Sequence, residues 1–241
     1  WLDGRNTRPG GSVSAKHGMT LRSAIIAPDG STNAKQLVDA LVCDCCQTDV
    51  ALTSRRPIAV YRDRTALEIR DIAVVSAIEG KWQQPVIIAR DDWLITGCPV
   101  NGPAIASHGD RVAVAWYTAS RNKPTIRMAR SIDGGRTFAP PIDVAADNPH
   151  GRVDVEILPS GTTFVSWIQP SNEDHGELRV NTVLANNELG TPLAVAPMGT
   201  ARSAGFPQMI SRGSDLVFAW VSGHGTQTRI ETRLGRTAGS N

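Results

Sequence analysis

The run Val114-Ala115-Trp116, two small or β-branched residues followed by an aromatic one, decides the fold of this 241-residue chain because the same pattern recurs along its whole length. The other copies are Trp1, Val60-Tyr61, Val165-Ser166-Trp167 and Phe218-Ala219-Trp220. Consecutive aromatic residues are roughly 50 to 60 positions apart, a spacing typical of stacked copies of one supersecondary unit that cannot bury its apolar face alone. The sequence therefore predicts a repeat protein.

Each repeat contains further short runs in the same order. An aliphatic residue next to an arginine follows the aromatic after about ten residues, in a run of alternating polarity. These pairs are Ile69-Arg70, Ile126-Arg127, Leu178-Arg179 and Arg229-Ile230. Another short run precedes the aromatic and ends in a turn cluster such as His108-Gly109-Asp110 or Pro159-Ser160-Gly161. This order predicts four antiparallel strands per unit, the content of one β-propeller blade.

We expect one propeller domain over residues 1–241, with blades at about 42–96, 97–147, 148–199 and 200–236 and blade remnants at 1–41. Trp1-Leu2-Asp3 has the pattern of a second strand whose inner neighbour is absent, so the domain is expected to be incomplete at its N-terminal side. An open propeller would leave sheet edges unpaired. Closure is therefore expected to come from a missing N-terminal segment or from a second chain.

The segment Ser131-Ile132-Asp133-Gly134-Gly135-Arg136-Thr137-Phe138 resembles the Asp-box, or BNR repeat, of sialidase-type propellers. Physically it is a hairpin in which Asp133 can accept bonds from turn amides, the glycines allow positive φ, and Phe138 packs beneath the blade. The resemblance implies an all-β, sialidase-like propeller that has six blades when complete, of which about five are represented here. It implies little about activity, because an Asp-box lies away from the binding face.

Charge and hydropathy exclude two classes of partner. The 25 lysines and arginines are scattered among 23 aspartates and glutamates, for a net charge of +2, so no basic stripe for nucleic acid is present. No apolar run has the length that a membrane crossing requires. We expect no nucleic-acid partner and no membrane span.

Propeller geometry gathers the loops that precede each first strand, and those between strands two and three, at one end of the molecule. This ligand face is expected to be rich in arginine, which suits a carboxylate, another small anion or a glycan because the guanidinium fork binds two oxygens at once. The candidate ligand-binding residues are Arg62, Arg64, Asn101, Arg152 and Arg202, and Arg8 and His224 belong to the same loops. For any one arginine, a solvated charge or an ion pair is the competing interpretation.

The same resemblance raises the question of catalysis. Sialidase-type enzymes hold a substrate carboxylate with arginines and use a tyrosine nucleophile, a glutamate that activates it, and an aspartate acid. Asp154 and Glu68 are the candidates for moving protons here. The only tyrosines, Tyr61 and Tyr117, lie at or beside structural aromatic positions, so no tyrosine–glutamate couple can be assigned.

We therefore favour a propeller that binds a small anion, a glycan or a soft metal ion at its axial face without turnover. Two alternatives stay open: an exo-sialidase-type glycoside hydrolase acting on an acidic sugar, and a scaffold that docks a protein partner.

The four cysteines occur in Val42-Cys43-Asp44-Cys45-Cys46 and Gly97-Cys98-Pro99, which precede the inner strands of neighbouring blades. All four sulfurs are thus expected close together. One interpretation is an exported protein with two disulfides, one of them joining Cys98 to the C-x-C-C segment. Another is a thiolate site for a soft ion such as copper, Cu(I), with Asp44 or His150 nearby. The remaining interpretations are a reactive thiol pair or buried free cysteines.

Four further segments resemble uncharacterised exported bacterial sialidase-like proteins that carry this C-x-C-C segment. They are Tyr61-Arg62-Asp63-Arg64, Ile69-Arg70-Asp71-Ile72, the run 97–103, and Gly151-Arg152-Val153-Asp154. The resemblance implies a periplasmic or secreted protein and brings no established reaction with it. From the residues alone, Arg70 and Asp71 are explained by an ion pair at the start of a strand.

Overall fold

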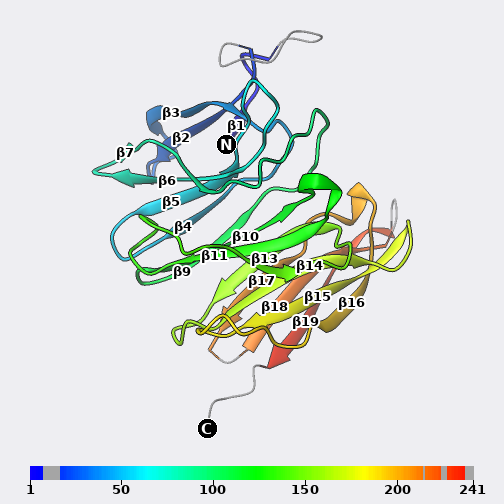
Figure 1. Ribbon diagram of the computed structural model, residues 1–241. Coiled ribbons are helices and arrows are strands. Elements are labelled where there is room, and N and C mark those ends of the chain that lie inside the picture. The colour runs from blue at the N-terminus through cyan, green and yellow to red at the C-terminus, as the bar shows by residue number, and fades with distance from the viewer. Residues whose placement is uncertain (8–16, 214, 224–226, 237–241) are drawn as a thin grey trace.

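The computed structural model describes residues 1–7, 17–213, 215–223 and 227–236, and nearly all of its regular structure is β-strand (Figure 1). Over these residues the helical segments are two short 3-10 turns, Ser120–Asn122 and Arg202–Ala204. The strands form five antiparallel sheets that follow one another along the chain, as the blue-to-red colouring of Figure 1 shows. The prediction of an all-β propeller made of repeated antiparallel sheets is confirmed.

Each sheet is built from consecutive strands. The first contains β1 (Leu2–Asp3), β2 (Met19–Ile26) and β3 (Thr32–Val42). The second contains β4 (Asp49–Leu52), β5 (Pro57–Arg62), β6 (Ile72–Ile78), β7 (Lys81–Trp82) and β8 (Val86–Ala89). The third contains β9 (Ala104–His108), β10 (Arg111–Thr118), β11 (Thr125–Ser131) and β12 (Ile142–Ala145). The fourth contains β13 (Gly151–Ile157), β14 (Thr163–Pro170), β15 (His175–Val183) and β16 (Leu193–Gly199), and the fifth contains β17 (Gln208–Arg212), β18 (Asp215–Ser222) and β19 (Arg229–Arg236).

The predicted four strands per unit are present in the third and fourth sheets, whereas the first and fifth sheets have three strands within the described residues. In the second sheet the outer strand is divided, because β7 and β8 both pair with β6. Pro85 lies in the gap between them and has no N–H to give to the ladder, so the pairing is interrupted there.

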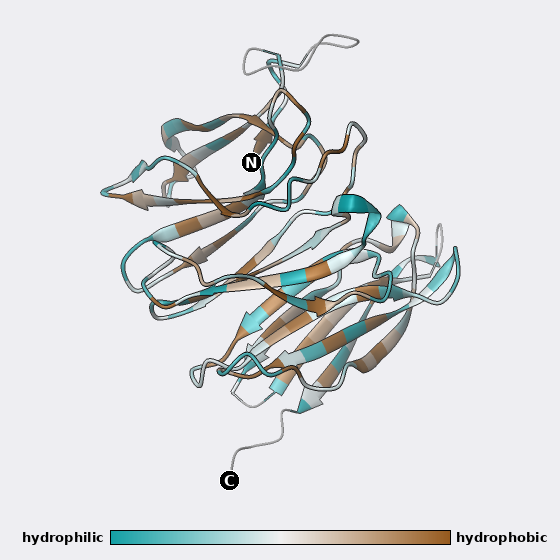
Figure 2. Cartoon of the chain, in the orientation of Figure 1, coloured by the Kyte–Doolittle hydropathy of each residue, from teal (hydrophilic) through white to brown (hydrophobic). Residues whose placement is uncertain are grey.

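The inner strands of successive sheets lie side by side: β4 contacts β9, β9 contacts β13, and β13 contacts β17. Along β13, Val153 and Val155 are buried in one cluster with Ala104 and Ala106 of β9, so alternate residues fill the space between two sheets. Figure 2 shows the same alternation of apolar and polar residues along many strands. This packing places the starts of the inner strands at a common end of the molecule.

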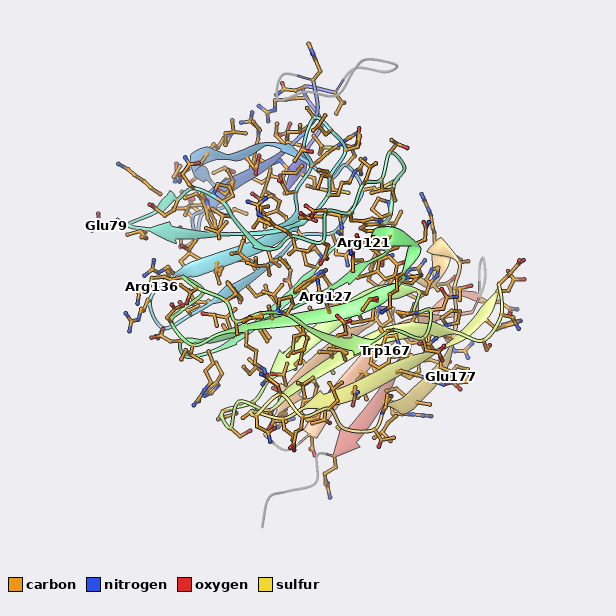
Figure 3. The ribbon with its side chains drawn as sticks, viewed as in Figure 1. Glu79, Arg121, Arg127, Arg136, Trp167 and Glu177 are labelled. Carbon is orange, nitrogen blue, oxygen red and sulfur yellow. A yellow bond between two sulfur atoms is a disulfide. The ribbon has the colours of Figure 1, made fainter. Side chains whose placement is uncertain are left out.

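The recurring aromatic residues are packed between the sheets, as the repeat predicts. Tyr61 and Trp116 are 0% exposed and Trp167, labelled in Figure 3, is 1% exposed, whereas Trp1 at the free edge is 50% exposed. An aromatic side chain buries about 150–250 Å². These residues are therefore major contributors to the cohesion between neighbouring sheets.

The Asp-box segment forms the predicted turn between β11 and β12. Asp133 Oδ1 accepts the amide hydrogens of Arg136 and Thr137 at 2.9 and 3.0 Å, and its Oδ2 accepts the Thr137 hydroxyl at 2.7 Å. Gly135 has φ +80°, and a Cβ there would lie 2.2 Å from Ile58 Cδ1 of the neighbouring sheet. Figure 3 shows Arg136 at this turn and Arg121, between β10 and β11, at the opposite end of the sheet, in accord with the predicted separation of the two faces.

Among the described residues, no helix is long and apolar enough to cross a membrane.

Candidate functional site

The cysteine-rich segment leads from β3 into β4, and Cys98 lies in the connection from β8 to β9. Cys45 and Cys98 form a disulfide whose Cα atoms are 6.2 Å apart. The bridge joins the starts of two neighbouring sheets, and the predicted link between Cys98 and the C-x-C-C segment is confirmed. Cys98 is exposed and Cys45 is half-buried, so the bridge lies near the protein surface.

Hydrogen bonds between the Gln47 side chain and the Gly102 backbone hold the same two segments together. The Gly102 amide donates to Gln47 Oε1 at 2.7 Å, and Gln47 Nε2 donates to the Gly102 carbonyl at 3.2 Å. A Cβ at Gly102 would lie only 2.0 Å from the Gln47 carbonyl oxygen, so this approach requires glycine. The two strand starts are therefore fixed against each other independently of the disulfide.

Cys43 and Cys46 are free thiols, each 1% exposed. The expected second disulfide is thus wrong, and so is a site in which all four cysteines bind one ion, because Cys45 and Cys98 are joined to each other. The Sγ atoms of Cys43, Cys45 and Cys46 nevertheless all lie within 4.8 Å of one another. The structure therefore places two buried thiols directly beside a disulfide sulfur.

The two thiols have opposite acidities. A hydrogen bond from Cys46 lowers the pKa of Cys43 to about 6; burial opposes this shift, and the Cys45 amide, Arg70 and Arg62 add to it. The pKa of Cys46 is raised above its ordinary value because its proton is held in the bond to Cys43 and because it is buried. At neutral pH the pair accordingly has the character of one thiolate and one thiol that share a proton.

Arg70 faces this pair from the segment before β6. Its Nη1 lies 3.4 Å from Cys43 Sγ, and its Nη2 donates to Glu68 Oε2 at 3.0 Å. The predicted ion pair between Arg70 and Asp71 is wrong, since the Asp71 carboxylate instead accepts the Trp93 amide at 3.4 Å. The role of Arg70 was not predicted, although its place in a segment with four other charged residues at 63–71 was a signal that these charges lie together.

Glu68 and Arg64 complete an ion-pair network over the cysteines. Arg64 donates to Glu68 at 2.7 and 2.9 Å and to Asp44 at 2.6 Å. The hydrogen bond from Arg64 lowers the pKa of Glu68; burial opposes the shift, and a bond from Arg70 contributes to it. Glu68 is thus an ionised partner of two arginines, and its role in proton transfer stays a prediction.

Arg62 and Arg152, two of the predicted anion-binding residues, are 1% and 4% exposed and direct their guanidinium groups at backbone carbonyls. Arg62 donates to the carbonyls of Asn101, Arg70 and Tyr117 at 2.5–2.9 Å and lies 4.8 Å above the Trp93 ring. Arg152 donates to the carbonyls of Thr200, Ala201 and Gly205 at 2.8–3.0 Å. Both arginines therefore tie one sheet to the next.

Asn101 also links two sheets. Its Oδ1 accepts the Arg152 amide at 2.7 Å, and its Nδ2 donates to the His150 carbonyl at 3.2 Å. Within the described part of the chain, no hydrogen bond joins His150 to the cysteine sulfur atoms. Arg202 lies exposed on the turn Arg202–Ala204, and its side chain makes no hydrogen bond to the described residues. Arg8 and His224 lie outside the described residues.

Asp154, a predicted candidate for moving protons, is half-buried on β13. Burial raises its pKa to about 7, against the bonds it accepts from the amides of Met209 at 2.5 Å and Val155 at 2.8 Å. Asp49 on β4 makes the equivalent bonds to Ile105 and Val50 at 2.9 and 2.8 Å. Because the same arrangement occurs at two sheet boundaries, the geometry is that of a structural tie, and the catalytic role of Asp154 stays a prediction.

Neither tyrosine is placed as a nucleophile. Tyr61 is fully buried and its hydroxyl donates to Asp39 Oδ2 at 2.6 Å, while burial raises its pKa above the ordinary range. Tyr117 packs edge-on against Trp93, with ring centroids 5.6 Å apart. Among the described residues, the observed partners of the two tyrosines are thus Asp39 and Trp93.

Solved structures with the same arrangement of sheets include two sialidases. The Hadza microbial sialidase Hz136 has a TM-score of 0.53 and 17% identity, over 77% of this chain and 43% of its own. The NanB sialidase of Streptococcus pneumoniae, as a K499G mutant, has a TM-score of 0.52 and 12% identity, over 84% and 32%. A protein of unknown function from Dyadobacter fermentans has a TM-score of 0.60 and 13% identity, over 94% and 70%.

These similarities show the fold: the chain is a sialidase-like β-propeller. It spans less than half the length of both sialidases. No protein-family model matches the chain, and no curated protein matches it either.

Proposed function

We propose that this chain is an exported, sialidase-like propeller that binds a soft metal ion, Cu(I) being the reference case, through Cys43 and Cys46 without turning over a substrate. The observation that carries the proposal is the approach of the sulfur atoms of Cys43, Cys45 and Cys46 to within 4.8 Å. Thiolate sulfur is the donor that Cu(I) prefers. Cys43 and Cys46 both belong to the short segment between β3 and β4. Because both thiols are buried, they form a compact site that is shielded from solvent.

Buried positive charge supports this function. Two thiolates with one Cu(I) ion carry a net charge of −1, which is costly to bury without compensation. Arg62 and Arg70 are 1% and 2% exposed, and both act electrostatically on Cys43. Their charge favours the deprotonated sulfurs that the ion requires.

The proposed location is the periplasm or the extracellular medium. A persistent disulfide between two sheets suits an oxidising compartment. The Asp-box turn and the C-x-C-C segment agree with membership of the exported sialidase-like branch that the sequence resembles.

The hydrolase alternative is less well supported. An acidic sugar would need arginines that are free to bind its carboxylate, yet Arg62 and Arg152 donate to backbone carbonyls. Of the predicted anion-binding arginines, Arg202 has a guanidinium group that makes no hydrogen bond to the described residues. The observation in its favour is Asp154, whose pKa of about 7 is that of a usable general acid. Release of the fluorophore from a fluorogenic sialoside, abolished in Asp154→Ala, would establish it.

Anaerobic titration with Cu(I), buffered by a chromophoric Cu(I) chelator and with ascorbate as the only reductant, tests the metal proposal. We expect one ion per chain, and at least about 100-fold weaker binding by Cys43→Ser and by Cys46→Ser, since each substitution removes one of two ligands. Ser160→Ala, an exposed turn residue at the other end of the sheets, is the matched control and should bind like the wild type. Binding that is equally tight in the double variant Cys43→Ser/Cys46→Ser would contradict the proposal.

A further inference from the structure

The disulfide is the more exposed part of the cysteine cluster. Cys45 contributes one sulfur to the group of three within 4.8 Å, yet that sulfur is bonded to Cys98. Cys98 is exposed, whereas Cys43 and Cys46 are buried, so a reagent in solution meets the bridge before the thiols. The bridge is therefore both the accessible and the chemically convertible part of the cluster.

We propose that the Cys45–Cys98 disulfide gates the metal site: its reduction frees Cys45 as a third thiolate, so that a two-sulfur site becomes a three-sulfur site. This inference rests on the proposed soft-metal function. The three ligands are then Cys43, Cys45 and Cys46, which lie within four consecutive positions together with the exposed Asp44. Cys98 becomes a free surface thiol.

A dithiol reductant supplies the electrons. One of its thiolates attacks the exposed Cys98 sulfur, the S–S bond breaks, and Cys45 leaves as a thiolate. The second thiolate of the reductant then displaces Cys98 from the mixed disulfide, so that the reductant ends as a cyclic disulfide. Two electrons have passed to the protein, and the two protons released by the reductant are taken up by Cys98 and by water or buffer.

The surroundings can accept a third thiolate. Arg70 Nε is buried and has no hydrogen-bond partner among the described residues, although the rest of this guanidinium contacts Cys43 and Glu68. An unpartnered buried donor beside a group of sulfurs is costly unless an anion accepts its hydrogen. Further negative charge on the sulfurs would reduce that cost.

The two sheets need not move for Cys45 to become available as a metal ligand. Gln47 and Gly102 hold the two strand starts together by hydrogen bonds that do not involve the bridge. Reduction would thus change the number of available sulfurs while leaving the thiol pair in place.

The test compares Cys98→Ser with Cys45→Ser, which both lack the bridge and differ in whether the third thiol is present. We expect Cys98→Ser to bind Cu(I) at least about 10-fold more tightly than Cys45→Ser and to show three Cu–S contacts by X-ray absorption, against two for Cys45→Ser and for the oxidised wild type. Wild-type protein treated with dithiothreitol, then freed of it without air, should match Cys98→Ser.

Each outcome is decisive. Equal affinity and two sulfurs in both variants would overturn the gating while leaving the proposed function intact. Absence of Cu(I) binding by the oxidised wild type and by Cys45→Ser would overturn the proposed function itself. Because both variants lose the same bridge, thermal unfolding of the two should be alike, and a difference in affinity then reports the third sulfur.

Discussion

Asp133 uses both of its carboxylate oxygens within a single turn. Burial disfavours its ionisation, but bonds from the amide and hydroxyl of Thr137, from Ser131 and from the Arg136 amide outweigh burial and hold its pKa below the usual range. A carboxyl group whose pKa is lowered on folding stabilises the protein above its unfolded pKa and loses that effect as the pH falls. The Asp-box turn between β11 and β12 is thus also a pH-sensitive element.

For Asp133→Ala we expect a loss of about 1–3 kcal/mol in the free energy of unfolding at pH 7, because several turn donors lose their acceptor. The loss should shrink as the pH falls below about 4, because the carboxyl of the unfolded chain then takes up a proton while the folded one, with its lowered pKa, is still ionised. Urea unfolding at pH 7 and at pH 3.5 measures both values, with Arg136→Ala, whose side chain is exposed, as the control. An undiminished difference at pH 3.5 would show that ionisation of Asp133 is not involved.

Inner strands β4 and β13 each contain an aspartate, Asp49 and Asp154, whose carboxylate accepts a hydrogen bond from a backbone amide of the next sheet. Asp154 differs from Asp133 in the sign of its shift: burial raises its pKa to about 7. Ionisation of such a group opposes folding, so stability is fully present below about pH 4 and is lost as the pH rises through 7.

We therefore expect wild-type protein to lose on the order of 2 kcal/mol of unfolding free energy between pH 4.5 and pH 8 through this carboxyl. Asp154→Asn should flatten that profile, although it also removes one of the two acceptors and lowers stability at pH 4.5. Guanidinium unfolding across this range gives the slope directly. Should the variant keep the wild-type slope, another group is responsible.

The strands, the repeat and the Asp-box turn could be predicted from the sequence because each depends on neighbouring residues. The link from Cys98 to the C-x-C-C segment was also predictable, since equivalent positions in adjacent repeats must lie close together. The targets of Arg62 and Arg152 were not, because a charged residue near a strand end does not reveal whether it meets a ligand or a backbone carbonyl about 50 residues away. The free state of Cys43 and Cys46 depends on side-chain positions that an even cysteine count does not determine.

Across the whole molecule, each boundary from the second sheet to the fifth has a polar tie at the same end. The disulfide, Arg62 and Asp49 join the second sheet to the third, and Arg152 and Asp154 join the fourth to the fifth. At this end Asn101 joins the third sheet to the fourth, while at the other end Arg130 of β11 donates to the Thr163 hydroxyl and to the Val183 and Leu184 carbonyls. A Cβ at Gly151 would lie 2.2 Å from Asn101 Oδ1, which shows how closely the two segments approach.

Asn101→Ala should therefore lower the unfolding free energy by about 1–3 kcal/mol, since it leaves the Arg152 amide and the His150 carbonyl without partners. Asn101→Asp should cost at least as much, because the carboxylate that accepts the Arg152 amide is buried and its second oxygen faces the His150 carbonyl. Asn33→Ala, at an exposed position of β3, is the control and should change stability by less than about 0.5 kcal/mol. Urea unfolding followed by tryptophan fluorescence measures all three, and an Asn101→Ala variant as stable as the control would mean that packing of β9 against β13 and the bonds of Arg130 suffice to hold this boundary.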